Sequence, residues 1–189
     1  AAGPAAQAGA TPRTPLDFRA FLSEPVFAGR VRAQPAFATR TEEEDMSLEQ
    51  DRYELNELAL RYARACDTCD AAEFAAIFTE DGEIQSPPHV MTGRDQIVAV
   101  VPATLQRLYL RTMHFVHNNQ IWIDGDTARG ETYCVAHHLT RESDTRASNY
   151  IMYIIYENEY RKEGGAWRFS RRKLNLRWSG TDNVDISAG

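Results

Sequence analysis

Apolar residues between positions 46 and 106 recur at intervals of three and four, which is the spacing of one face of a helix. The chain changes character at Met46, and Ser47 followed by Gln50 is a capping-box pattern that predicts a helix start. This helix should run for about 18 residues and end near Asp67. Its buried stripe would consist of Leu48, Leu55, Leu58, Ala59, Tyr62 and Ala65.

Two shorter helices are expected next. Asp70 and Glu73 repeat the capping pattern, so Asp70 is best explained as a helix cap. The helix that follows should end at Asp81-Gly82, and its apolar face would be Phe74, Ile77 and Phe78. A further helix is expected over residues 94–106, unless Pro102 ends it earlier.

The pattern from residue 111 onward is typical of β-strands. Turn residues at Gly125, at 142–144 and at Gly164-Gly165 separate long runs of strand-forming residues. Runs joined by tight turns predict antiparallel neighbours, and helices followed by such a meander predict an α+β fold with helices covering one face of the sheet. The expected strands are a short one near 83–85 and four long ones at 111–123, 128–140, 147–160 and 166–178.

Length and composition indicate one domain with an extension. The chain has 189 residues, of which 43% are hydrophobic and 25% charged, as in ordinary globular proteins. Residues 1–45 show no sustained helical or strand period, so we expect a flexible N-terminal extension there and the domain at 46–189.

Charge and cysteine content indicate which partners and which cell compartment to expect. A net charge of −6 and a pI of about 5.4 disfavour nucleic acid as a partner, and no apolar run is long enough to predict a membrane span. Three cysteines in a chain of this size fit a reducing compartment, which favours a cytoplasmic location. The Cys66–Cys69 pair has redox or zinc spacing, but no second pair and no thioredoxin-like context accompany it.

Candidate chemistry lies on two of the predicted strands. In a regular strand His114, Val116, Asn118 and Gln120 share one face and His117 takes the other, which argues against a zinc site made by both histidines. On the last strand Arg172 shares a face with Leu174, Leu176 and Trp178. A guanidinium on an apolar face requires an anionic or carbonyl partner, from the protein or a ligand, unless it reaches water at the sheet edge.

Several other residues could belong to a ligand pocket. One of His137 and His138 must face inward, and Tyr62 either points its hydroxyl into the same cavity or is part of the core. No phosphate-binding glycine loop, nucleophile elbow or dinucleotide fingerprint is present, so no cofactor and no metal are expected. We expect the substrate pocket to be lined by Tyr62, Val116, His137, Leu174 and Trp178.

Five segments together resemble SnoaL-like proteins of the nuclear transport factor 2 superfamily, over residues 46 to about 180. They are Arg61 to Asp67, Phe74 to Gly82, Met113 to Phe115, Tyr156 to Tyr160 and Trp167 to Ser170. Within that group the chain looks most similar to scytalone dehydratase, bile-acid 7α-dehydratase and lindane dehydrochlorinase. The resemblance implies a cone-shaped α+β barrel, in which a curved antiparallel sheet wraps around N-terminal helices and an apolar pocket.

The resemblance also implies catalytic roles. An Asp after the first helix pairs with a His on the first long strand, and these positions correspond to Asp67 and His114. The His removes a proton from the substrate, and an Arg on the final strand, here Arg172, helps hold the departing group. Imidazole is a competent base near neutral pH, and a carboxylate on its other nitrogen fixes the tautomer and stabilises the imidazolium.

The implied function is a cofactor-independent lyase, dehydratase-like, or an isomerase. It would act on a hydrophobic ring compound such as a steroid or polyketide. One alternative is a noncatalytic protein that binds a small apolar molecule in the same pocket. Another is the small subunit of a ring-hydroxylating oxygenase. The resemblance further implies a homodimer or homotrimer.

Overall fold

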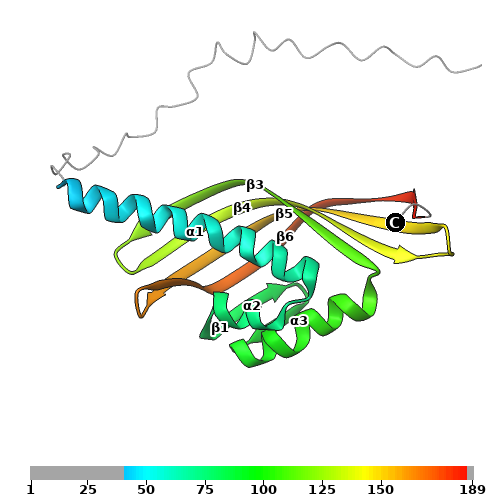
Figure 1. Cartoon of the computed structure of the whole chain (residues 1–189), viewed down its shortest axis with the longest axis horizontal. Coiled ribbons are helices and arrows are strands. Elements are labelled where there is room, and N and C mark those ends of the chain that lie inside the picture. Colours follow the sequence, from blue (N-terminus) through cyan, green and yellow to red (C-terminus); the bar gives the residue numbers. More distant parts are fainter. Residues whose placement is uncertain (1–40, 187–189) are drawn as a thin grey trace, which may run out of the picture. The chain divides into compact units, whose positions relative to one another are not determined.

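The computed structural model describes residues 41–186, so the extension expected over residues 1–45 lies almost wholly outside the described part of the chain. Three helices and six strands follow one another along the chain (Figure 1). The helices are α1 (Glu42–Thr68), α2 (Ala71–Ile77) and α3 (Arg94–Leu108). The strands are β1 (Phe78–Ser86), β2 (His89–Thr92), β3 (Arg111–Asp124), β4 (Thr127–Arg141), β5 (Arg146–Glu163) and β6 (Ala166–Asp185).

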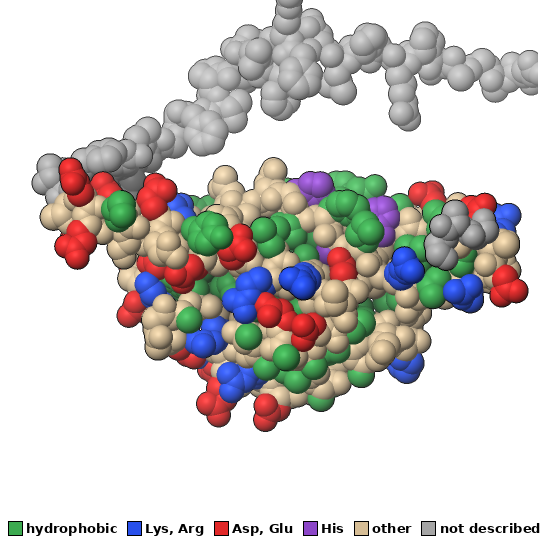
Figure 2. All heavy atoms as spheres, viewed as in Figure 1, with side chains coloured by type: hydrophobic (Ala, Val, Ile, Leu, Met, Phe, Trp, Pro, Cys, Tyr) green, Lys and Arg blue, Asp and Glu red, His purple; other side chains and the backbone are tan. Residues whose placement is uncertain are grey.

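Helix α1 begins before the expected start. The helix cap is Thr41, whose hydroxyl accepts from the backbone N–H of Glu44, while the Glu44 carboxylate accepts from the Thr41 N–H at 2.8 Å. The prediction of a start at Met46 with a Ser47–Gln50 box is therefore wrong. Acidic side chains fill the first turn (Figure 2), where they favourably oppose the positive end of the helix dipole.

The second helix is capped as predicted but is shorter. The Asp70 side chain accepts from the backbone N–H of Glu73 at 3.0 Å. The helix ends at Ile77 instead of Asp81-Gly82, because Phe78 already pairs with Phe169 of β6 as the first residue of β1. Helix α3 continues past Pro102 to Leu108.

The strands form one open sheet in the order β2-β1-β6-β5-β4-β3. The four long strands are antiparallel neighbours, as predicted, whereas β1 runs parallel to β6. The α+β class with helices against one face of a curved sheet is thus confirmed (Figure 1). The sheet is not closed into a barrel, since β2 and β3 form its two edges.

Bulges change which side chains face the helices. On β3 the register shifts between Val116 and Asn119, so His114 and Val116 face inward at one end and Asn119 faces inward beyond the bulge. The expectation that Asn118 and Gln120 share the face of His114 is wrong, because one extra residue reverses the alternation.

An aromatic core fixes the C-terminal half of α1 against the sheet. The Tyr62 ring lies edge-on to Phe74, Tyr156 and Phe169, with centroids 5.7, 5.8 and 6.1 Å away. Tyr62 is one of the residues that the helical pattern predicted to be buried, and only 7% of its surface is exposed. This packing determines where the following turn of α1, which carries Asp67, meets the sheet. No helix in residues 41–186 has the length and apolar character needed to cross a membrane.

Candidate active site

A cavity of about 720 Å³ lies between α3, the end of α1 and the inner face of the sheet. Most of its wall is apolar, including Ile84, Val101, Leu105, Met152, Ile154 and Leu174. Polar groups on the α1 and sheet sides include His114, His138, Tyr156 and Arg172, and α3 contributes Gln96, Thr104 and Arg107. An apolar cavity with a small number of polar groups is the usual form of a small-molecule site.

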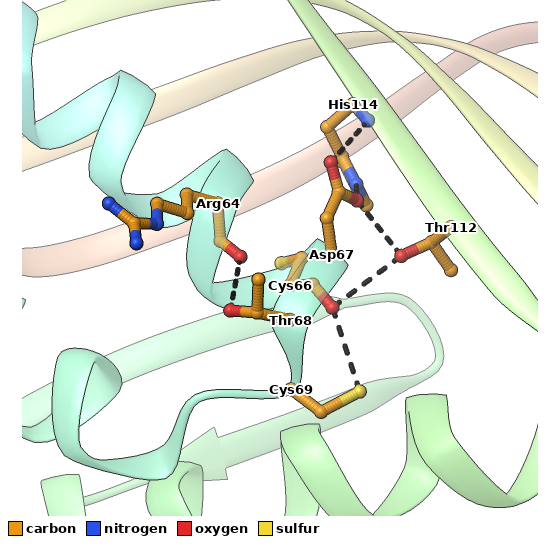
Figure 3. A network of polar contacts seen from close by, with 7 residues as sticks. All are labelled: Arg64, Cys66, Asp67, Thr68, Cys69, Thr112 and His114. Atoms are coloured by element: carbon orange, nitrogen blue, oxygen red, sulfur yellow. Dashed lines mark hydrogen bonds and ion pairs between the residues drawn. The ribbon is translucent and has the colours of Figure 1, made fainter.

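Asp67 and His114 are in direct contact (Figure 3). The ring Nδ1 of His114 lies 2.7 Å from Oδ1 of Asp67, and the backbone N–H of His114 donates to Oδ2 at 2.9 Å. The Thr112 hydroxyl donates to Oδ1 at 2.9 Å. The carboxylate is therefore held at both oxygens by neighbouring residues of β3.

These contacts determine the charge and the tautomer of the pair. Burial would raise the pKa of Asp67, but the hydrogen bonds from the His114 ring, the His114 backbone and Thr112 outweigh it and hold the pKa below its usual value. An ionised carboxylate only accepts hydrogen bonds, so Nδ1 of His114 carries the proton. A neutral His114 ring then has its lone pair on Nε2, on a side chain that lines the cavity.

The histidine that joins His114 in the cavity is His138. The two rings lie 5.7 Å apart, and His138 also packs against Tyr109 at 4.7 Å. Burial, reinforced by the proximity of His114, lowers the pKa of His138 to about 4, so its ring is neutral near pH 7. The pocket position expected for His137 is wrong: His137 lies on the opposite face, beside Phe115 and hydrogen-bonded to Asn149.

The bulge in β3 explains why His114 lies on the same face of the sheet as His138, since β4 itself alternates without a break from Ala128 to His138. Near the turn, Asp124 pairs with Thr127, and an unbroken continuation of that register would set His114 opposite His137. The extra residue between Val116 and Asn119 moves the pairing, so His114 lies opposite Ala136. His138, two residues further along β4, then shares the inner face with His114.

Arg172 is buried in the cavity wall, with 1% of its surface exposed. Its guanidinium lies over the rings of Tyr156 and Tyr62, at 3.7 and 4.1 Å from their centroids, and Nη1 donates to Oδ1 of Asn158 at 2.8 Å. No Asp or Glu within residues 41–186 forms an ion pair with it. Because its side chain is buried, Arg172 does not reach water at the sheet edge, and that option is ruled out.

Of the four other predicted pocket residues, Tyr62 and Leu174 line the cavity, as expected, and Val116 and Trp178 do not. Val116 is on the inner face but is not among the lining residues. Trp178 is 62% exposed and stacks on Tyr153 at 4.9 Å, because a second register shift turns it to the outer face. The expectation that Trp178 lines the pocket is wrong for that reason.

The cysteines and histidines of residues 41–186 form no metal centre. All three cysteines are free thiols, and Cys66 and Cys134 are buried. In residues 41–186 no group of three or more His, Cys, Asp or Glu side chains is placed to hold a metal ion.

Fold and cavity together define the class of protein, an α+β domain with a largely apolar cavity between its helices and its sheet. The family model of the SnoaL-like domain matches residues 49–173, and the chain belongs to this family. None of the curated proteins matches the chain significantly.

Solved structures with the same fold include two that carry enzyme names. A hexachlorocyclohexane dehydrochlorinase, LinA type 2, superimposes with a TM-score of 0.67 at 18% identity, covering 73% of this chain and 93% of its own. A candidate scytalone dehydratase from Novosphingobium aromaticivorans gives a TM-score of 0.63 at 26% identity, covering 75% of this chain and 93% of its own. The chain also superimposes on a candidate aromatic ring hydroxylase from Novosphingobium aromaticivorans, with a TM-score of 0.62 at 19% identity, covering 71% of this chain and 94% of the other. This similarity shows a shared fold only.

Proposed function

We propose that the protein is a cofactor-independent lyase or isomerase that removes a proton from a hydrophobic small molecule. The observation that carries the proposal is the Asp67–His114 pair on the wall of an apolar cavity. A carboxylate, an imidazole and a bound substrate in that order form the usual arrangement for a general base.

In the proposed reaction Nε2 of His114 takes a proton from a carbon next to an activating group. Asp67 stabilises the imidazolium that results, since its negative charge is already aligned with the ring. The electron pair left on carbon either expels a leaving group, as in a lyase, or moves to a neighbouring carbon that is reprotonated, as in an isomerase. The imidazolium returns its proton to the leaving group or to that carbon.

Two further side chains assist in this proposal. Arg172 offsets the negative charge that develops on an oxygen or a departing group, and the dry surroundings strengthen this interaction. His138 is neutral at pH 7 and can donate one hydrogen bond to the same oxygen without carrying charge. This role of His138 adds to the three residues that the sequence suggested.

The experiment is incubation of the protein in D₂O with a panel of ring ketones, phenols and halogenated rings, followed by mass spectrometry. A base in the cavity should either place deuterium in the substrate or its isomer, or convert the substrate into the product that has lost its leaving group, and His114→Gln should abolish both changes. His117→Gln is the matched control, because His117 is an exposed histidine of the same strand. Incorporation that persists in His114→Gln contradicts the proposal.

A second candidate is a noncatalytic binding protein, which the largely apolar lining favours. It predicts that ligands bind equally to wild type and His114→Gln and that no product forms on long incubation. Substrate depletion that depends on His114 counts against it.

A further inference from the structure

The permanently charged side chains in the cavity wall are both basic. They are Arg107 and Arg172, and within residues 41–186 no Asp or Glu side chain lines the cavity. His89, His114 and the neutral ring of His138 also line it. The protein as a whole has a net charge of −6, so this local excess of positive groups runs against its composition. A low-dielectric cleft with charges of one sign concentrates ligands of the other sign.

No carboxylate in residues 41–186 forms an ion pair with Arg172. Asp67, which acts on the same thiols as Arg172, is bonded to His114 and Thr112 instead. Two thiols and three phenols interact with the charge of Arg172, and burial raises the pKa of each, to about 12 for Cys66 and about 11 for Cys134. They are therefore neutral near pH 7. The phenols are Tyr62, Tyr156 and Tyr160.

A series of hydrogen bonds between uncharged side chains stabilises the guanidinium in place of a counterion. Nη1 of Arg172 donates to Asn158 at 2.8 Å, Asn158 donates to the Thr132 hydroxyl at 2.9 Å, and Thr132 donates to Asn119 at 2.9 Å. Asn119 in turn donates to Oδ1 of Asn56 on α1 at 3.0 Å. In each link the oxygen accepts from the group that is nearer to Arg172 along the series, so the series stabilises the cation and leaves its charge uncancelled.

The guanidinium also has an unused donor. Its Nε is buried and has no hydrogen-bond partner within the described residues. A buried donor without a partner is costly, and a ligand oxygen in the adjoining cavity would satisfy it. Arg107 is exposed and lies at the mouth of the same cavity, where it can attract an anion from solvent.

We propose that the ligand of this cavity is an apolar ring compound that carries one anionic oxygen group, such as a carboxylate, bound against Arg172. This inference rests on the proposed function in that it names the substrate class of the same site. In this inference Arg172 holds a charge that the substrate carries throughout the reaction, in place of a charge that develops on a departing group, and the anionic group lies apart from the carbon that loses its proton at His114.

The test compares 2-naphthoate with its neutral analogue of similar shape, 2-naphthamide, by calorimetric titration in chloride-free buffer. Wild type should bind naphthoate about tenfold tighter or more, the factor expected for a charge-assisted hydrogen bond. Asn158→Asp places a carboxylate beside Arg172 and should abolish this preference without weakening naphthamide. Arg172→Met should act in the same way.

Arg171→Gln is the matched control, because Arg171 pairs with Glu159 and should leave the preference intact when changed. His114→Gln should also keep it, since the base takes no part in anion binding. Equal affinities in wild type, or a preference that survives Asn158→Asp, would overturn the inference. Either result leaves the D₂O experiment on His114 as an independent test of the proposed function.

Discussion

The carboxylate of Asp67 and the imidazole of His114 are fixed to each other through both carboxylate oxygens. One oxygen lies 2.7 Å from the ring Nδ1, and the other accepts a hydrogen bond from the backbone N–H of the same histidine at 2.9 Å. The contact joins the last turn of α1 to the start of β3 (Figure 3). Because the carboxylate cannot rotate without losing a bond, the ring has one orientation relative to the cavity.

Loss of the base should reduce turnover while leaving the fold intact. We expect His114→Gln to lower kcat by about 10²- to 10⁴-fold, the usual contribution of a positioned base. Rates on whichever substrate the deuterium screen identifies provide the measurement. His117→Gln should retain wild-type kcat, and a comparable loss in that control would point to a structural effect instead.

Removal of the Thr112 hydroxyl should raise the pKa of Asp67. Thr112→Val deletes one of the hydrogen bonds that hold this pKa below its usual value, and carbon-13 NMR of the carboxyl group measures the change. A depressed native pKa gives stability that is present above the unfolded pKa and is lost as the pH falls through the native value. In the variant this contribution should be smaller, and its loss should be complete at a higher pH than in wild type. Identical acid-unfolding curves for wild type and Thr112→Val would contradict the role given to the Thr112 hydrogen bond.

His138 should make the wild-type protein less stable as the pH falls from about 6.5 to about 4. The native ring resists protonation, whereas the unfolded chain takes up a proton near 6.5, so protons favour the unfolded state in this window. The loss should approach ~3 kcal/mol in the free energy of unfolding. Urea titrations at pH 7 and 4.5 measure it, and His138→Gln should show a smaller difference. If the stability of wild type and of His138→Gln depended on pH in the same way, the prediction would be wrong.

The outer face of the sheet should hold a second copy of the chain. Met113, Phe115 and Trp178 are 56%, 45% and 62% exposed there, and large exposed apolar groups on one face indicate an interface. We expect a homodimer or homotrimer by light scattering, and Trp178→Glu should shift it toward monomer. A wild-type monomer at tens of micromolar would rule this interface out.

Periodicity predicted the helices and long strands because burial imposes a repeat of 3.6 or 2 on the sequence. Thr41 was missed as the cap of α1 because Ser47 offered an equally good local pattern. The bulges could not be predicted, since an extra residue in a strand is visible only against its partner. They account for the inward position of His114 and the outward position of Trp178. Family spacing placed Asp67 and His114 together, and the structure brings them into contact.

The tautomer of His114, observed in long-range ¹H–¹⁵N spectra, tests the central claim most directly. His114→Gln assigns the signals, and Asp67→Asn removes the charge that fixes the ring. The account predicts that the neutral ring carries its proton on Nδ1 in the wild type, leaving Nε2 free as the base, and that Asp67→Asn shifts the balance toward the Nε2 proton. A wild-type ring protonated on Nε2, or a tautomer indifferent to Asp67→Asn, would contradict it.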